Sequence, residues 1–225
     1  MFFYSEKKTL VLRCASVVVA IILSTSGAGW GAAVNIEITG WVTHIYDDAG
    51  VLEGQINVDD IVTGWYRYDS STPDTNPSIA IGDYKYNTPP FGVSLNIGGL
   101  LFASDPQNLD FLIQVRNDYN SEDIYLLSST NNLPILNDVT VAPIRWLLED
   151  DTCTALNSDA LPLTAPTWAG WCSGNTLSIT CRSGSQAARI EGTMTDAQLV
   201  PEPASAFIMA FGATIIGLRR RNVRL

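Results

Sequence analysis

Carboxylates are the most abundant chemically active side chains of this chain, and paired carboxylates could supply the acid and base of a glycoside hydrolase. Close pairs or triplets occur at residues 47–48, 59–60, 118–123 and 149–151. Hydrolysis requires two carboxyl groups that face each other across a cleft, about 5 to 9 Å apart, which no spacing along a sequence establishes. Aspartates at turns and strand ends commonly accept hydrogen bonds from nearby backbone amides, so these groups favour turns over catalysis.

The other common catalytic residues are scarce. His44 is the only histidine, so a multi-histidine metal centre is excluded and a nucleophilic triad has a single possible base. The Gly-x-Ser-x-Gly elbow, the His-Glu-x-x-His zinc motif and the phosphate-binding glycine loops are absent from the sequence. We therefore expect a protein that is not an enzyme and has no cofactor, with a hydrolase as the less favoured alternative.

One segment gathers oxygen donors of the kind that calcium prefers. Between residues 69 and 83 these donors are Asp69, Asp74, Asn76 and Asp83. The EF-hand pattern is absent, so a site would need an irregular loop and backbone carbonyls. The competing interpretation is a plain polar turn. We expect no metal, and calcium at this loop is the alternative.

Tryptophans offer a second kind of chemistry, the stacking of sugars. Apolar residues alternate along the segments around Trp41 and Trp65, and both tryptophans fall on the side opposite the expected core. An outward aromatic ring can bury the C–H face of a pyranose, so the pair predicts a carbohydrate platform. The alternative is packing: either both faces of the sheet are covered, or the segment 168–171 plugs one end of the domain.

The cysteines after residue 34 suggest a disulfide. They are Cys153, Cys172 and Cys181, and their spacing fits neither a paired zinc motif nor a redox motif. A bridge between Cys153 and Cys172 would close a loop of about 20 residues and stabilise the fold by about 3 kcal/mol in the chain-entropy model. A bridge between Cys172 and Cys181 is the competing pair, because Cys181 lies close by in an expected strand.

The elements that must position these residues are strands. Clusters of Gly, Pro, Asn, Asp and Ser recur between short segments in which apolar and polar residues alternate. We expect strands over residues 34–46, 61–69, 91–97, 100–103, 109–115, 124–128, 139–148, 176–181 and 188–194. Pro143 interrupts residues 139–148, which fit either a central strand bent at a bulge or two short pieces, and the tyrosine side of residues 61–69 is the expected core side. This pattern predicts an all-β domain, an antiparallel β-sandwich of jelly-roll-like form, over residues 34–199.

The charge of the domain restricts its partners. Residues 34–200 carry six Lys and Arg against 21 Asp and Glu, a net charge of −15. A field of that sign repels phosphate backbones and anionic lipid headgroups. We therefore expect no nucleic acid as partner.

The N-terminal residues 1–33 have the organisation of a secretory signal peptide. Basic residues precede an apolar run over 15–23, and small residues follow up to position 33. We expect signal peptidase to cut between Ala33 and Val34, so that the rest of the chain is exported through the inner membrane. An uncleaved N-terminal anchor is the alternative.

The C-terminal segment, residues 200–225, has three parts. They are the tripeptide Pro201, Glu202 and Pro203, an apolar run over 204–218, and a basic tail over 219–225 that begins with Arg219, Arg220 and Arg221. A helix over 204–218 would be about 22 Å long, short for a bilayer core of about 30 Å but insertable with local thinning and snorkelling arginines. Because basic flanks stay in the cytoplasm, this transmembrane helix would leave the domain outside the inner membrane.

These three parts together resemble the PEP-CTERM sorting signal of Gram-negative bacteria, which the membrane transpeptidase exosortase processes. The body of the domain is similar to uncharacterised exported domains of PEP-CTERM proteins over residues 40–42, 64–69, 71–77, 82–84, 91–99 and 158–162. The resemblance implies processing near residues 201–203 and a mature form at the cell surface or outside the cell. A plain C-terminal anchor is the alternative.

The sequence therefore predicts an exported protein of the cell surface or extracellular matrix, with a non-enzymatic structural or interaction role in the exopolysaccharide layer. Signal peptidase and exosortase are its expected partners during maturation, and the inner membrane holds it until processing. Extracellular polysaccharide is the further expected partner. A carbohydrate-binding module that uses Trp41 and Trp65 is the alternative function.

Overall fold

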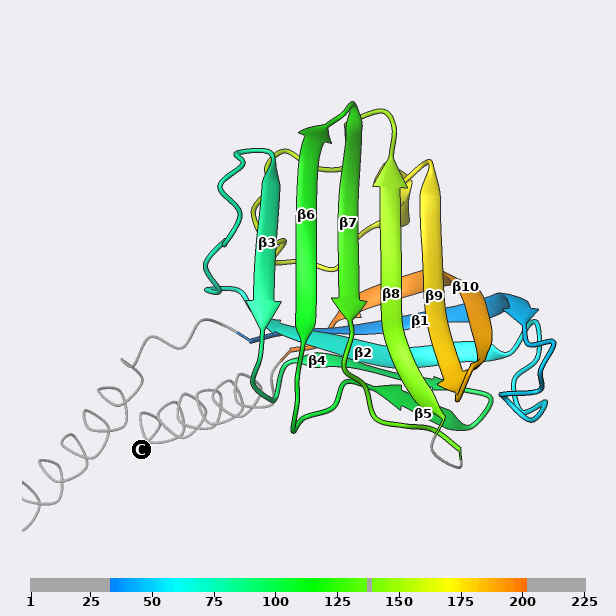
Figure 1. Ribbon diagram of the computed structural model, residues 1–225. Coiled ribbons are helices and arrows are strands. Elements are labelled where there is room, and N and C mark those ends of the chain that lie inside the picture. Colours follow the sequence, from blue (N-terminus) through cyan, green and yellow to red (C-terminus); the bar gives the residue numbers. More distant parts are fainter. Residues whose placement is uncertain (1–32, 137–138, 202–225) are drawn as a thin grey trace, which may run out of the picture. The chain divides into compact units, whose positions relative to one another are not determined.

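The computed structural model describes residues 33–136 and 139–201, and its regular elements are strands with one short 3-10 turn (Figure 1). The strands are β1 (Ala33–Tyr46), β2 (Ile61–Asp69), β3 (Ile81–Tyr86), β4 (Gly92–Ile97), β5 (Leu100–Ala103), β6 (Phe111–Tyr119), β7 (Glu122–Ser129), β8 (Thr140–Asp150), β9 (Gly174–Ser183) and β10 (Gln186–Leu199), and the 3-10 turn is η2 (Trp168–Gly170). All neighbouring strands pair antiparallel. The prediction of an all-β, antiparallel fold is thereby confirmed.

Several expectations from the sequence fall outside the described residues. They concern the signal peptide up to residue 32, Glu202 and Pro203 of the tripeptide, the apolar run over 204–218, and Arg219, Arg220 and Arg221. No helix in the described part of the chain is long and apolar enough to cross a bilayer. Ala33 is the first residue of β1 and pairs with Asp69, and Pro201 is exposed just after β10 ends.

The ten strands form one continuous sheet, in the order β3-β6-β7-β8-β9-β10-β1-β2-β4-β5. The sequence predicted a sandwich of two separate sheets, and the structure differs because β9 and β10 join the two halves by hydrogen bonds. In Figure 1, β3, β6, β7 and β8 stand upright, and β1, β2 and β4 run across below them. The sheet therefore curls so that its two halves face each other.

Register shifts bend the strands at the places where the sheet turns. In β1 they lie between Thr39 and Gly40 and between Val42 and His44, and in β8 one lies between Val141 and Ile144. Such bulges bend a strand and increase its twist. The shift in β8 coincides with Pro143, where the sequence predicted a bend.

Gly40 allows β1 and β10 to approach closely. A Cβ atom at this position would lie 2.1 Å from the carbonyl oxygen of Thr193 and 2.8 Å from the Cα of Met194. A side chain at Gly40 would therefore push the two strands apart at the bend.

An aromatic cluster at the centre of the core connects the two halves of the sheet. Trp146 of β8 is fully buried, and its ring meets that of Tyr66 of β2 edge to face, with centroids 5.9 Å apart. Tyr125 of β7 lies 6.4 Å from the Trp146 ring and donates a hydrogen bond to the Tyr66 hydroxyl at 3.3 Å. The indole N–H of Trp146 donates to Asn175 Oδ1 at 3.0 Å. The tyrosine side of residues 61–69 is thus the core side, as the alternation predicted.

Replacing Trp146 with Ala should destabilise the domain strongly, by about 3 to 5 kcal/mol, because it empties a large volume between the two halves. The matched control is Trp65→Ala, which removes the same side chain from an exposed position and should cost about 1 kcal/mol or less. Urea unfolding followed by circular dichroism measures both. Equal losses in the two variants would show that Trp146 is not the central contact.

Candidate functional site

Trp41 and Trp65 lie on the outer face of neighbouring strands β1 and β2. Their side chains are 43% and 38% exposed, whereas the adjacent Val42 and Tyr66 are fully buried. The alternation of these strands therefore turns both indole rings away from the core, as the sequence predicted. Among the described residues, these are the tryptophans that the structure leaves exposed.

The pairing of β1 with β2 sets the separation of the two rings. Trp41 lies opposite Ile61, and Trp65 lies opposite Glu37. The two pairs are four positions apart, which corresponds to about 13 Å along the strands. The rings share one face of the sheet without touching.

Polar side chains fill the space between the apolar ones on this face. Thr39 lies opposite Thr63, which in turn lies opposite Asn96 of β4. Leu101 of β5 pairs with Asn96 and is exposed, as is Ile61. We call this surface the tryptophan face; it comprises Glu37, Thr39, Trp41, Ile61, Thr63, Trp65, Ser94, Asn96 and Leu101. It offers apolar area for C–H groups beside hydroxyl and amide groups for hydrogen bonds.

The tryptophans of the segment 168–171 have a structural role. Trp168 and Trp171 pack against the core, and the Trp168 ring meets Trp146 edge to face at 5.8 Å. The indole N–H of Trp168 donates to the backbone carbonyl of Thr195. For Trp168 and Trp171, packing against the core is therefore the better interpretation than sugar binding.

The predicted calcium segment uses its oxygen atoms in hydrogen bonds. Asp74 Oδ1 accepts from the backbone N–H groups of Asn76 and Asp83, both at 2.8 Å. Asp83 accepts from Asn76 Nδ2 at 2.9 Å and from Gln114 Nε2 at 2.6 Å. Asp69 accepts from Ser71 N at 2.8 Å. Amide donors thus already bond several of the oxygens that a cation would need, and calcium at this loop stays a prediction.

Two buried carboxylates that the sequence placed among ordinary turn residues organise a long loop. Asp123 of β7 and Asp150 of β8 lie opposite each other at one end of the core, and both are fully buried. Asp150 accepts hydrogen bonds from the backbone N–H groups of residues 152, 154 and 155, at 3.0, 2.8 and 3.0 Å. Asp123 accepts from Leu156 N at 2.8 Å and Asp118 N at 2.9 Å. The two side chains hold the start of the loop that carries η2.

The cysteines lie beside these carboxylates. All three described cysteines are free thiols, so neither Cys153 with Cys172 nor Cys172 with the buried Cys181 is bridged in the structure. Cys172 Sγ donates to Asp150 Oδ1 at 2.9 Å. This hydrogen bond is the main cause that lowers the pKa of Asp150 below its usual range and raises the pKa of Cys172. Loss of solvation, followed by Asp118, raises the pKa of Cys153 to about 11.

Two groups in the described part of the chain bring three potential metal ligands together. They are Asp118 with Asp123 and Cys153, and Asp150 with Asp151 and Cys172; in each, the ligand atoms lie within 4.8 Å of one another. A thiol ligand must lose its proton, and the raised pKa of both thiols opposes that loss. Asp123 and Asp150 already accept hydrogen bonds from backbone N–H groups. The role that the structure supports for the two clusters is therefore to hold the loop that carries η2.

Replacing Asp150 with Asn should destabilise the domain at neutral pH, because a neutral amide accepts the loop hydrogen bonds less strongly. The pKa of Asp150 is lowered in the folded state, and an unfolded aspartate titrates near about 3.9. Its ionised form therefore stabilises the fold above about pH 4, and this contribution is lost as the pH falls further. Urea unfolding should show a gap between wild type and Asp150→Asn at about pH 7 that narrows at about pH 3. A gap of equal size at both pH values would contradict this role.

No protein-family model, curated protein or solved structure matches this chain. The function proposed next therefore rests on the residues and faces of the chain itself.

Proposed function

We propose that this chain is an exported, non-enzymatic protein of the cell surface or extracellular matrix, and that its tryptophan face binds polysaccharide. The supporting observation is the exposure of Trp41 and Trp65 on one face, with hydroxyl and amide side chains between them. Covering an exposed indole ring with another apolar surface is favourable, by about 25 cal/mol for each Å² of apolar surface buried. The C–H face of a sugar ring is such a surface, and its hydroxyls match the polar neighbours.

The spacing of the rings favours a polymer over a single sugar. A separation of about 13 Å along the strands exceeds the width of one sugar ring, so one ligand reaches both indoles only if it has several units. The face spans β1, β2, β4 and β5, which lie side by side in the sheet. On this proposal the curled sheet encloses one core, as a jelly-roll-like sandwich would, and its outer surface is available to bind polysaccharide.

The export part of the proposal rests on the two ends of the chain. Signal peptidase would cut between Ala33 and Val34, and exosortase would process the chain near residues 201–203, with Arg219, Arg220 and Arg221 on the cytoplasmic side. The structure offers one supporting observation. The backbone N–H of Val200 donates to the carbonyl of Asn35 at 2.9 Å, and the exposed Pro201 follows directly. The sorting tripeptide would therefore begin directly after β10, the last strand of the described chain.

Replacing both Trp41 and Trp65 with Ala should weaken binding to the native exopolysaccharide. We expect about a tenfold loss for each ring, and roughly additive free energies because the rings do not touch. Affinity electrophoresis of the mature protein in gels that contain the polysaccharide measures the effect. The matched control is Ile79→Ala, which removes an exposed apolar side chain outside the face. Unchanged retention of a folded double variant would refute the platform.

Replacing Pro201, Glu202 and Pro203 with alanines should abolish sorting. We expect the wild type to appear as a shortened form at the cell surface or in the medium, and the variant to keep its full C-terminus in the inner membrane. Intact mass and cell fractionation measure both. The same full-length, membrane-bound form in both strains would indicate a plain anchor and remove the main support for a matrix protein.

A further inference from the structure

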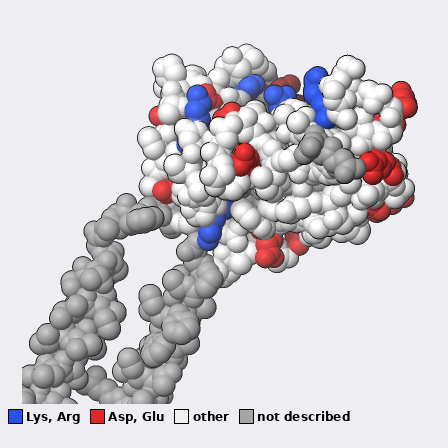
Figure 2. Space-filling view, turned by 60° about the horizontal axis from the view of Figure 1, so that its bottom comes forward, with Lys and Arg blue, Asp and Glu red and all other residues white. Residues whose placement is uncertain are grey.

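The few basic residues of the domain gather on one half of the sheet. Of the six Lys and Arg between residues 34 and 200, five lie on β3 and on β6 to β10: Lys85, Arg116, Arg145, Arg182 and Arg189. Figure 2 shows most of the basic residues in view in the upper part, with some acidic residues among them and others at the right and in the lower part. In a domain with a net charge of −15, the few positive charges are thus concentrated on this half of the sheet, which also carries Glu149 and Glu191.

Three of these arginines line a hollow on the outer face of the sheet, which we call the arginine hollow. Its volume is about 400 Å³, within the range of small-ligand sites. Arg116, Arg145 and Arg189 reach it from β6, β8 and β10, over a floor that includes Ile124, Leu126 and Leu147. The hollow thus combines an apolar floor with three cations.

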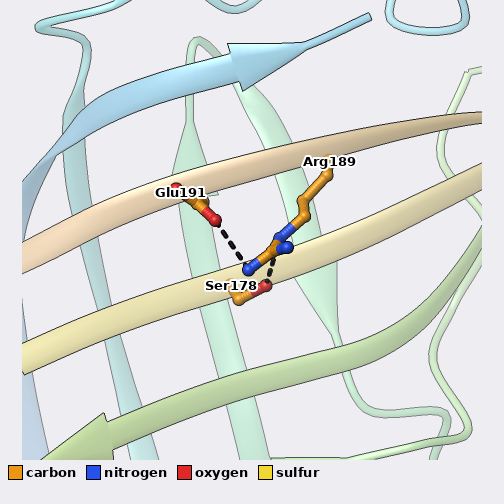
Figure 3. Close-up of polar contacts among 3 residues, drawn as sticks. All are labelled: Ser178, Arg189 and Glu191. Atoms are coloured by element: carbon orange, nitrogen blue, oxygen red, sulfur yellow. Dashed lines mark hydrogen bonds and ion pairs between the residues drawn. The ribbon is translucent and has the colours of Figure 1, made fainter.

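Contacts within the sheet hold Arg189 beside the strand position of Arg145. Arg189 forms an ion pair with Glu191 at 2.6 Å, and its Nε donates to Ser178 Oγ at 3.2 Å (Figure 3). Ser178 lies directly opposite Arg145 in the pairing of β8 with β9. The Arg189 guanidinium is therefore held over the strand position next to Arg145.

The other two arginines have no acidic partner in the described part of the chain. Arg116 Nε donates to Gln114 Oε1 at 2.6 Å, and its guanidinium lies 5.7 Å from the centre of the Tyr119 ring. The side chain of Arg145 is exposed and makes neither a hydrogen bond nor an ion pair with another described residue. One carboxylate, that of Glu149, also lines the hollow. With Glu191, which pairs with Arg189, two carboxylates lie beside three guanidiniums, so positive charge exceeds negative charge by one at this place.

The composition of the hollow selects the chemistry of a ligand. A guanidinium binds a carboxylate through two parallel hydrogen bonds. The floor suits the C–H groups of a sugar ring, while Thr176, Ser178 and Glu149 can bond its hydroxyls. A nucleic acid fits poorly, because its dense phosphates would meet Glu149 and the acidic surface beyond the hollow. These features match a ring that carries one carboxylate and several hydroxyls.

We propose that the arginine hollow binds an acidic polysaccharide through the carboxylates of its uronic acid units. Arg145 and Arg189 bind one carboxylate, and Arg116 binds another further along the chain. Arg116 of β6, Ile124 of β7 and Glu149 of β8 lie opposite one another across the three strands. Glu149 is four positions from Arg145 along β8, so Arg116 and Arg145 are separated by about 13 Å along the strand direction. This site lies on a different part of the sheet from the tryptophan face and does not depend on that face binding sugar.

The test measures binding of the mature protein to polygalacturonate by affinity electrophoresis. Arg145→Gln should weaken binding about tenfold, and Arg145→Gln with Arg189→Gln about a hundredfold, since each removes a charge-assisted pair. Arg145→Lys keeps the charge but loses the planar fork, so it should fall between wild type and Arg145→Gln. The matched control is Arg182→Gln, an exposed arginine of β9 that does not line the hollow, which should bind as wild type does.

Three results would overturn the proposal, given variants that keep the wild-type melting temperature. They are equal weakening by Arg182→Gln, undiminished binding of methyl-esterified polygalacturonate, and tighter binding of single-stranded DNA than of polygalacturonate. The double variant Trp41→Ala with Trp65→Ala separates the two sites. It should keep polygalacturonate binding whether or not it loses the native exopolysaccharide.

Discussion

One constraint shapes the whole domain: a single sheet with one apolar face has no second layer to cover that face, so it must cover itself. Trp146 shows how this is done, because it touches Tyr66 from the opposite half of the sheet and Tyr125 from the neighbouring strand. Burial of these rings stabilises the curled form of the sheet. The bulges in β1 and β8 supply the bend, and the hydrogen bonds between β9 and β10 keep the two halves in one sheet.

The curl leaves one end of the core open, and the loop that carries η2 closes it. Trp168 packs on Trp146 from this loop. The loop has few backbone partners of its own, so the side chains of Asp123 and Asp150 accept its N–H groups. Two buried carboxylates are costly unless they are fully hydrogen-bonded, which explains why backbone donors surround them. The abundance of acidic residues is therefore partly structural.

Sequence alternation was enough to predict features that depend on one strand alone. It placed Trp41 and Trp65 outward, Tyr66 inward, and the bend of β8 at Pro143. It missed β3, a short edge strand among turn residues, and it predicted two sheets because nothing local shows that β9 and β10 link the halves. The arginine hollow was equally hidden, since Arg116, Arg145 and Arg189 become neighbours only through the order β6-β7-β8-β9-β10. Long-range register, which short segments do not encode, decides such sites.

The distribution of charge makes two parts of the outer surface suited to different parts of a polysaccharide. The tryptophan face carries hydroxyl and amide groups and the carboxylate of Glu37, so it suits uncharged stretches of a polysaccharide, whereas the arginine hollow suits carboxylates. An acidic polymer meets repulsion from a domain of net charge −15. At physiological salt, however, exposed charges more than about 8 Å apart are largely screened, so the distant acidic surface acts weakly. Arg145 and Arg189 act at contact distance over an apolar floor, where screening is least, and local charge therefore outweighs the net charge of the domain.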